Sequence, residues 1–500
     1  MKELRAILPD QININNPDCY VKIVGMLQEN WALLVPDSDG YSIRIYFCHG
    51  KYRPTDGVVG VFDSLVFKNK SDAEKELELN GFLYIQKSSK IELNLDTFPP
   101  LPPSKYNPVP HANGLIYSSG RYWASIGESE FLQKKVDNRD YLKQLIDQDR
   151  LDINWSPLFD TEPKLKEQIP IDRLRGMLLG LAIGDSLGNT SEAMLPATRF
   201  QRHGEIRNYR KNRYAHNRNV GLPSDDTQMA FWTLESIVEQ GQFKPNDIAE
   251  KFSTRQIYGR GQSVGEFVAN YSRGMEWPEA SSKSAGNGAL MRIPAIIAAY
   301  QNGSTADLWI DTVLCAAVTH NDRASISACF AFVGILLELL EMSGPPEQEW
   351  WVERYVAYAH PLEGDKAYQP RGGDYLGKFS GTLSQFVLQT VPDALIRETA
   401  TVDACNRWFS GAYLLETVPS VLMILSKHAA EPEEAIIRAV NDTKDNDTIA
   451  AIVGAAMGAL YGETALPQRW IDDLLGRTAQ DDDGKVFDLL NDLARSTSRI

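Results

Sequence analysis

The chain has 500 residues, of which 43% are hydrophobic, 23% charged and 10% aromatic. This composition excludes a mainly disordered or collagen-like protein, and the length predicts two domains, because one compact core rarely serves so long a chain. The formal net charge of −15 argues against nucleic acid as a partner. The one basic stretch, residues 199–218, is interpreted as a solvated loop.

The cysteine pattern and the hydropathy favour a cytoplasmic protein with no membrane partner. The five cysteines are scattered and form no CxxC pair, as is usual for reduced thiols. The N-terminal MKELRAILPDQIN lacks the apolar core of a signal peptide. The longest apolar runs, such as residues 330–340, are shorter than the roughly 18–20 residues that span a bilayer.

Residues 1–96 predict a small α+β accessory domain. Short β-branched or aromatic runs alternate with Asn, Asp, Gly and Pro turns, as strands do. The expected strands are residues 20–24, 31–35, 41–47, 58–67 and 82–85. A charged helix capped by Ser71 is expected over residues 71–79. Nothing in this domain suggests catalysis.

Residues 97–170 are expected to connect two domains. Six of the fifteen residues from Thr97 to His111 are proline, which fits neither a helix nor a central strand. An extended linker is therefore expected there. Behind it, apolar residues between Phe131 and Ile146 recur at helical spacing.

Residues 171–500 predict an all-α domain. Segments rich in alanine and leucine, with apolar residues three or four apart, indicate successive helices. They cover residues 173–184, 227–239, 306–318, 324–341, 411–427 and 447–461, and a last helix contains residues 486–493.

Glycine recurs every fourth residue in two of these segments, at Gly176, Gly180 and Gly184, and at Gly454, Gly458 and Gly462. Glycine costs about 1 kcal/mol relative to alanine in a helix interior. A repeated row therefore indicates that another backbone packs closely against it.

Polar clusters adjoin these helices. Asp185 follows the first glycine row, residues 224–227 (SDDT) open the helix that runs to 239, and residues 445–448 (DNDT) precede the second row. Each SDDT or DNDT cluster alone is typical of a helix cap. Together the four aspartates and two of the hydroxyls of SDDT and DNDT, with no His or Cys, suit Mg²⁺, Mn²⁺ or Ca²⁺. Six protein oxygens exceed what one Mg²⁺ takes, because it keeps several waters, so two ions are expected.

Five motifs, in their order and spacing, resemble the ADP-ribosylglycohydrolase family. They are GLAIGDSLGNTSE, SDDTQMA, SAGNGALMR, THND and DNDTIAAIVGAAMGALYG. The resemblance covers about residues 171–480 and leaves the N-terminal hundred residues unexplained. It implies an all-α ADP-ribosylglycohydrolase domain that follows the small α+β N-terminal domain.

The resemblance also implies residue roles. The ligands of two Mg²⁺ or Mn²⁺ ions would be Ser224, Asp225, Asp226, Asp445, Asp447 and Thr448. Glu192, which resembles the family's mobile glutamate, and Asp225 are candidates for the general base. Substrate contacts are expected from Asp185, Gly286, Asn287, Gly288, His320 and Tyr413. The Gly-Asn-Gly run exposes N–H groups that can line a phosphate.

The implied reaction is hydrolysis of the C1″ glycosidic bond of an ADP-ribosylated protein, with arginine as the first expectation for the linkage. Three alternatives stay open. The chain occludes an ADP-ribosyltransferase toxin or enzyme as an immunity protein, it keeps the fold without activity, or it hydrolyses another ADP-ribose conjugate. The acids argue against an inactive relative, because a purely structural chain has no need to hold four carboxylates together.

Overall fold

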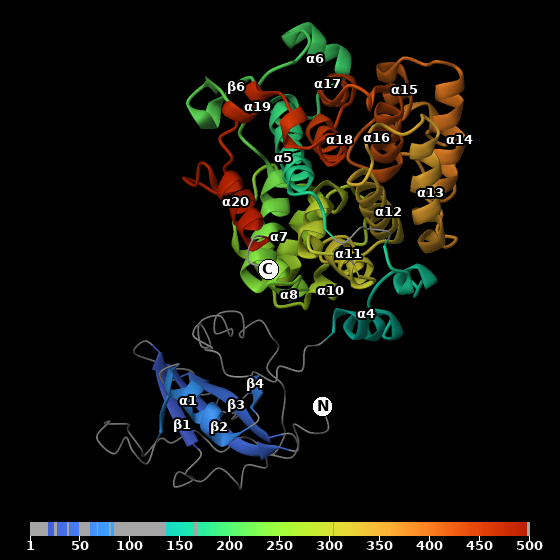
Figure 1. Cartoon of the computed structure of the whole chain (residues 1–500). Helices are drawn as coiled ribbons and strands as arrows, with labels where there is room; N and C mark the ends of the chain where they lie inside the picture. The colour runs from blue at the N-terminus through green and yellow to red at the C-terminus, as the bar shows by residue number, and fades with distance from the viewer. Residues whose placement is uncertain are drawn as a thin grey trace. The chain divides into compact units, whose positions relative to one another are not determined.

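The structure, a computed structural model, describes residues 19–24, 28–37, 40–49, 61–67, 69–79, 82–84, 137–163, 168–303 and 305–497. The chain divides into two compact units, Met1–Asp137 with Arg273–Met275, and Asn138–Ser272 with Glu276–Ile500. Figure 1 shows the elements of both units. Within these described ranges, no helix is both long and apolar enough to cross a membrane.

The N-terminal unit contains a five-stranded sheet and a helix. The strands are β1 (Cys19–Val24), β2 (Gln28–Asp37), β3 (Gly40–His49), β4 (Val61–Phe67) and β5 (Leu83–Tyr84). They are antiparallel throughout, in the order β4-β3-β2-β1-β5. Helix α1 (Lys70–Leu79) packs on β3 and β4. The core holds Tyr20, Ala32, Leu34, Ala73 and Leu77.

The α+β fold predicted for the N-terminal part of the chain is therefore confirmed. Each expected strand has a counterpart, and the expected helix differs from α1 by one residue. Residues 58–60 and Ile85, which were included in the predicted strands, lie outside the described residues. The proline-rich segment from Thr97 to His111 lies outside them too. Of the helix predicted between Phe131 and Ile146, the structure describes the part in α4 (Asn138–Asp147).

The second unit is helical, as predicted. Its α-helices after α4 are α5 (Ile171–Gly188), α6 (Pro196–His203), α7 (Asp225–Gln240), α8 (Pro245–Thr254), α9 (Gln262–Ser272), α10 (Trp277–Ala280), α11 (Asp307–Ala317), α12 (Arg323–Leu339), α13 (Trp350–Glu363), α14 (Leu383–Ile396), α15 (Thr401–Arg407), α16 (Leu414–His428), α17 (Pro432–Asp442), α18 (Asn446–Tyr461), α19 (Gln468–Asp472) and α20 (Lys485–Thr497). A short ribbon of β6 (Lys211–Asn212) and β7 (Arg218–Asn219) lies between α6 and α7.

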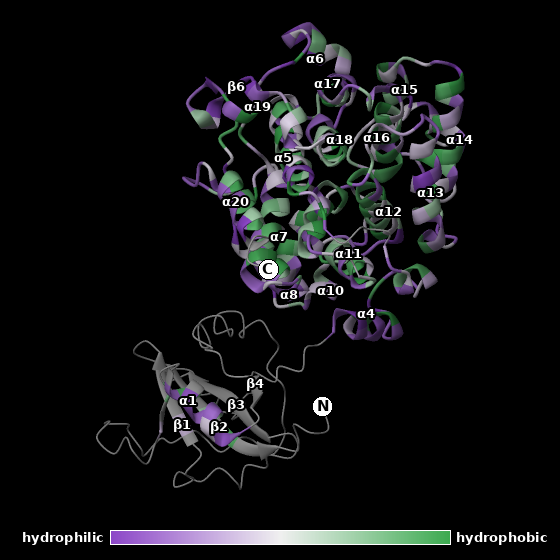
Figure 2. Cartoon of the chain, in the orientation of Figure 1, coloured by the Kyte–Doolittle hydropathy of each residue, from purple (hydrophilic) through white to green (hydrophobic). Residues whose placement is uncertain are grey.

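The core of this unit is built around α5 and α18. Both helices are buried over most of their length, and α18 also packs on α17, α16 and α12. Figure 2 shows apolar residues concentrated on these inner helices, whereas α4 is largely hydrophilic. Helices that are apolar all round belong in a protein interior, and α5 and α18 meet that description.

Candidate active site

The two glycine rows pack against each other. A Cβ atom on Gly180 would overlap the carbonyl of Gly454, and one on Gly458 would overlap the carbonyl of Gly176. The pairs run in opposite directions along the chain, so α5 and α18 are antiparallel. The contact continues to Gly188, whose Cβ would meet the backbone of Asp447. The predicted close approach is confirmed, and it brings the C-terminal end of α5 to the N-terminal end of α18.

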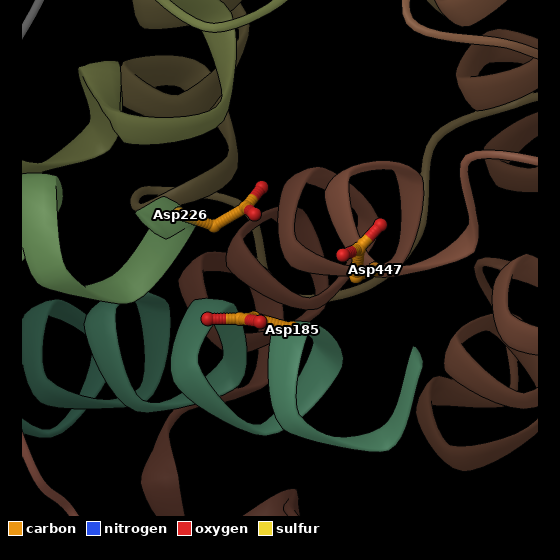
Figure 3. A group of neighbouring side chains, drawn as sticks. All are labelled: Asp185, Asp226 and Asp447. Atoms are coloured by element: carbon orange, nitrogen blue, oxygen red, sulfur yellow. The ribbon is translucent and has the colours of Figure 1, made fainter. Parts of the chain in front are cut away.

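Three buried carboxylates meet where these helix ends join α7. Asp185 comes from α5, Asp226 from the first turn of α7 and Asp447 from the first turn of α18 (Figure 3). One carboxylate oxygen from each lies within 4.8 Å of the others. A second group, Glu192, Asp445 and Asp447, meets the same criterion. Asp447 belongs to both groups, which we call together the carboxylate cluster.

Asp185 is fixed by the start of α7. It accepts hydrogen bonds from the Ser224 hydroxyl at 2.6 Å and the Ser224 N–H at 2.8 Å. The Thr227 hydroxyl donates to it at 2.6 Å, and the Asn189 amide at 3.0 Å. Asp185, which is predicted to contact the substrate, has its carboxylate in the cluster beside Asp226 and Asp447.

The other predicted ligands surround the same point. The Ser224 hydroxyl lies 3.4 Å from Asp226 Oδ2, and the Thr448 side chain hydrogen-bonds to Asp226. Asp225 is 8% exposed on the same turn of α7, outside both three-carboxylate groups.

A loop formed by Gly286, Asn287 and Gly288 lies against the cluster. The Asn287 side-chain amide donates to Asp445 Oδ2 at 2.6 Å and to Thr417 Oγ1 at 3.0 Å. The backbone of Gly286 bridges to Tyr413, and the Asn287 N–H donates to the Ala412 carbonyl at 3.2 Å. The structure therefore brings the predicted substrate loop and the predicted ligand Asp445 together.

His320 lies directly behind this loop. A Cβ on Gly288 would be 2.9 Å from its Cε1, so that position favours glycine, and a Cβ on Gly286 would be 3.2 Å from its Nε2. Its Nδ1 pairs with the Thr319 hydroxyl at 2.9 Å. Burial, followed by the charge of Arg292, lowers the pKa of His320 to about 3, so the ring is neutral.

Tyr413 is buried, with the Arg371 guanidinium carbon 4.0 Å from the centre of its ring. Because a guanidinium is attracted to an aromatic face, this contact holds Arg371 beside the glycine loop. The predicted substrate-facing aromatic thus has a cation on one face.

Comparison of the sequence with known proteins shows the family of the chain that carries this site. Residues 166–499 match the family described as ADP-ribosylglycohydrolase. The chain belongs to the ADP-ribosylglycohydrolase family. It is therefore an enzyme that hydrolyses a glycosidic bond to ADP-ribose, as its motifs predicted.

Several curated members of the family are similar to this chain. The ADP-ribosylarginine hydrolase Tri1 of Pseudomonas putida (strain GB-1) is 26% identical over 60% of this chain and 74% of its own. The ADP-ribosyl-[dinitrogen reductase] glycohydrolase of Rhodospirillum rubrum is 26% identical over 61% and 90%. The human ADP-ribosylhydrolase ARH3 is 25% identical over 60% and 88%.

The chemistry of the cluster fits divalent metal ions. Burial, then Asp445 and Asp185, raise the pKa of Glu192 to about 7, and burial raises that of Asp445 to about 6. Burial, then Asp185 and Glu192, raise the pKa of Asp225 to about 8. Asp226 Oδ1 is buried without a partner among the described residues. Crowded carboxylates of this kind, with an unused buried oxygen, suit hard cations that prefer oxygen ligands.

Arg199 corrects the interpretation of residues 199–218 as a solvated loop. Its side chain is fully buried and donates to Ser191 Oγ at 3.0 Å and to the Met194 carbonyl at 3.0 Å. It also donates to the Thr443 carbonyl at 2.6 Å. It thus joins the turn that carries Glu192 to the segment before Asp445. Its sequence gave no signal of burial, because the acceptors on the far side lie more than 240 residues away.

Asn446 makes a second link that the sequence did not predict. Its side-chain amide donates to the Gly188 carbonyl, to Ser191 Oγ and to the Val440 carbonyl, each at 3.1 Å. The residue between the two predicted ligands Asp445 and Asp447 therefore points toward α5 and the Glu192 turn.

Proposed function

We propose that this enzyme removes ADP-ribose from arginine side chains of proteins and uses two Mg²⁺ ions bound between α5, α7 and α18. The supporting observation is the shared carboxylate: Asp447 belongs both to the group with Asp185 and Asp226 and to the group with Glu192 and Asp445. A carboxylate shared in this way is suited to bridging two ions. One relative is named for ADP-ribosylarginine and another for a modified protein, which supports the target class.

The aspartates of the two groups, Asp185, Asp226, Asp445 and Asp447, are the proposed ligands. Ser224, Asp225 and Thr448, which the sequence predicted as ligands, lie on the same turns and are proposed with them. When bound, the divalent ions supply positive charge for anchoring ribose hydroxyls and for lowering the pKa of water. Mn²⁺ has the same ligand preference and is the proposed substitute.

Glu192 is the proposed general base. Its side chain reaches solvent, unlike those of Asp445 and Asp447 beside it, although the surrounding protein partly shields its carboxylate from water. It lies on the turn after α5. A carboxylate that borders the cluster and reaches solvent can accept a proton from a water molecule there. Its carboxylate would take the proton of the attacking water while the C1″ bond to the arginine nitrogen breaks.

The glycine loop is the proposed diphosphate site. Gly286 and Gly288 let the loop backbone lie close against His320, and Asn287 holds the loop against Asp445. Backbone N–H groups of such a loop bind phosphate oxygens well. Arg371, over the Tyr413 ring, adds a positive charge beside it.

Replacement of Glu192 tests the proposal. Glu192→Gln should lower kcat on ADP-ribosyl-arginine peptides by about 10²–10⁴-fold, the usual range for general base catalysis. Glu347→Gln, at an exposed glutamate, is the matched control and should leave kcat unchanged. Full turnover in Glu192→Gln would remove this residue as the base. Hydrolysis of ADP-ribosyl-serine peptides alone would overturn the arginine linkage, and no release from either, despite bound Mg²⁺, would favour occlusion of a transferase.

A further inference from the structure

One lobe of the helical unit lies in the chain between two segments of the proposed site, the Glu192 turn and the start of α7 at Ser224. Residues 195–221, here called the basic lobe, follow the Glu192 turn and end three residues before Ser224. The Asn189 amide donates to the Leu222 carbonyl at 2.8 Å, which closes the base of the lobe. The lobe contains α6 and the β6–β7 ribbon (Figure 1). It therefore adjoins the turn on which Glu192 is exposed.

The lobe is anchored to the rest of the unit. Beyond the contacts of Arg199, the Ile206 backbone exchanges two hydrogen bonds with the Asn441 amide, at 2.8 and 2.9 Å. The Tyr209 hydroxyl donates to the Trp470 carbonyl at 3.1 Å, and the Gly221 N–H to the Asp473 carbonyl at 2.9 Å. The outer surface of the lobe is thus held in a fixed position, which lowers the entropy cost of binding a partner.

The outer surface of the lobe carries positive charge that the protein does not neutralise. Five cations have no carboxylate partner within the described ranges: Arg202, Arg210, Lys211, Arg213 and Arg218. Arg207 differs, because it pairs with Glu205 and Glu434. Burial, then the charges of Arg210 and Arg202, lower the pKa of His203 on α6, as expected where cations gather. This positive surface contrasts with the net charge of −15 of the whole chain.

Large apolar side chains are exposed on the same lobe. Leu195 is 51% exposed, Phe200 65% and Tyr214 68%. The Arg213 guanidinium carbon lies 4.6 Å from the centre of the Tyr214 ring. Aromatic residues and arginine are the side chains most enriched in protein interfaces.

We infer that the basic lobe is the docking surface for the modified protein, and that it selects targets whose modified arginine lies in an acidic segment. The inference rests on the proposed function, because the modified arginine of a target must reach the exposed Glu192. A mixed surface of cations and exposed aromatic or aliphatic side chains fits an acidic peptide segment. The strongly negative remainder of the chain repels a long polyanion such as nucleic acid.

Matched peptides test this inference on the full chain. Each carries one ADP-ribosyl-arginine and a fluorescent label, flanked by glutamates, serines or lysines, and free ADP-ribosyl-arginine serves as a small substrate. The lobe variant is Lys211→Glu with Arg213→Glu, both at exposed positions. The control is Lys143→Glu with Lys378→Glu, at exposed lysines outside the lobe.

For wild type we expect a KM about tenfold lower for the glutamate-flanked peptide than for the serine-flanked peptide, and this preference should shrink at high salt. The lobe variant should lose the preference or favour the lysine-flanked peptide, and the control should keep it. Free ADP-ribosyl-arginine should be hydrolysed equally by all three proteins.

Two outcomes would overturn the inference. One is equal peptide selectivity in wild type and in the lobe variant. The other is tighter binding of a single-stranded oligonucleotide than of the glutamate-flanked peptide at 0.15 M salt, which would assign the lobe to nucleic acid. Failure of wild type to hydrolyse free ADP-ribosyl-arginine would contradict the proposed function instead. Fluorescence anisotropy of the labelled peptides would still decide the role of the lobe.

Discussion

The side-chain amide of Asn287 donates a 2.6 Å hydrogen bond to Asp445 and thereby ties the glycine loop to the carboxylate cluster. The same amide donates to Thr417 Oγ1 at 3.0 Å, at the start of α16. The diphosphate site and the metal site that we propose are therefore held at one fixed separation. ADP-ribose requires such spacing, because its distal ribose and its phosphates are covalently linked.

Removal of this amide should weaken metal binding. Asn287→Ala deletes a hydrogen bond that orients Asp445, a proposed ligand, and the loss of such a contact usually costs about 10–100-fold in metal affinity. We expect a rise of this size in the Kd for Mg²⁺, measured by calorimetry, together with a higher KM for ADP-ribosyl-arginine. Asn302→Ala, at an exposed asparagine, should change neither value. An unchanged Kd for Mg²⁺ in Asn287→Ala would contradict the proposal that Asn287 orients Asp445 for metal binding.

Arg199 should control turnover by holding the Glu192 turn. Arg199→Met removes the donors to Ser191, Met194 and Thr443, so the turn loses its connection to the segment before Asp445. A displacement of about 1 Å is enough to lower a rate about 100-fold. We expect a fall of this order in kcat on free ADP-ribosyl-arginine at a temperature where the variant is folded.

Two further variants test whether Arg199 acts by positioning the Glu192 turn, by its charge alone, or as any arginine of α6 would. Arg199→Lys keeps the charge but not the forked donors, and should recover only part of kcat. Arg202→Met, at an exposed arginine of the same helix, should keep kcat on this small substrate. If folded Arg199→Met kept the wild-type kcat, Arg199 would have no role in positioning the Glu192 turn.

The sequence predicted the acid clusters and the glycine rows, but not how they combine. Periodicity shows which face of a helix is bare, whereas the identity of the facing helix depends on chain topology. The meeting of Gly180 with Gly454, which brings Asp185 to Asp447, therefore emerged only from the fold. The sequence did indicate where the acids would meet, because each glycine row has an aspartate of the cluster at one end: Asp185 after the first row and Asp447 before the second.

Other features carried no sequence signal. A buried arginine and a solvated one look alike in a basic stretch, so Arg199 was missed. The strands of the N-terminal unit were predicted well, because their β-branched runs are short and bounded by turn residues. The role of Glu192 is a proposal that its replacement by glutamine tests, and those of Ser224, Asp225 and Tyr413 are proposals too.

The glycine contact should resist even one added methyl group. Gly180→Ala places a Cβ against the backbone of Gly454, and a backbone carbonyl cannot rotate away as a side chain can. Overpacking usually costs 1–3 kcal/mol, and we expect a loss of about 3 kcal/mol in the free energy of unfolding. Chemical denaturation measures this loss. Gly344→Ala meets open space and should be neutral, and equal stability of the two variants would contradict the account.

His320 should make the protein less stable in acid. Its pKa falls from 6.5 to about 3 on folding, so between these values the unfolded chain binds a proton that the folded chain does not. Stability from this group is therefore complete above pH 6.5 and is lost as the pH falls toward 3. The loss between pH 7 and pH 5 is about 2 kcal/mol.

A comparison of pH slopes isolates this contribution. His320→Gln should show a smaller loss of unfolding free energy between pH 7 and pH 5 than wild type, whatever its stability at neutral pH. His216→Gln, at an exposed histidine, is the matched control and should keep the wild-type slope. An identical slope in His320→Gln and wild type would show that the buried ring does not titrate as described.

The most direct test of the central claim is release of ADP-ribose from an arginine-ADP-ribosylated protein in Mg²⁺, after EDTA, and after Mg²⁺ is restored. Asp447→Asn removes the carboxylate that both groups share, and Asp365→Asn, at an exposed aspartate, is its control. The account predicts that wild type releases ADP-ribose in Mg²⁺, stops in EDTA and recovers when Mg²⁺ is restored. Asp447→Asn should release none, whereas Asp365→Asn should release ADP-ribose as wild type does. Undiminished release in EDTA or by Asp447→Asn would contradict it.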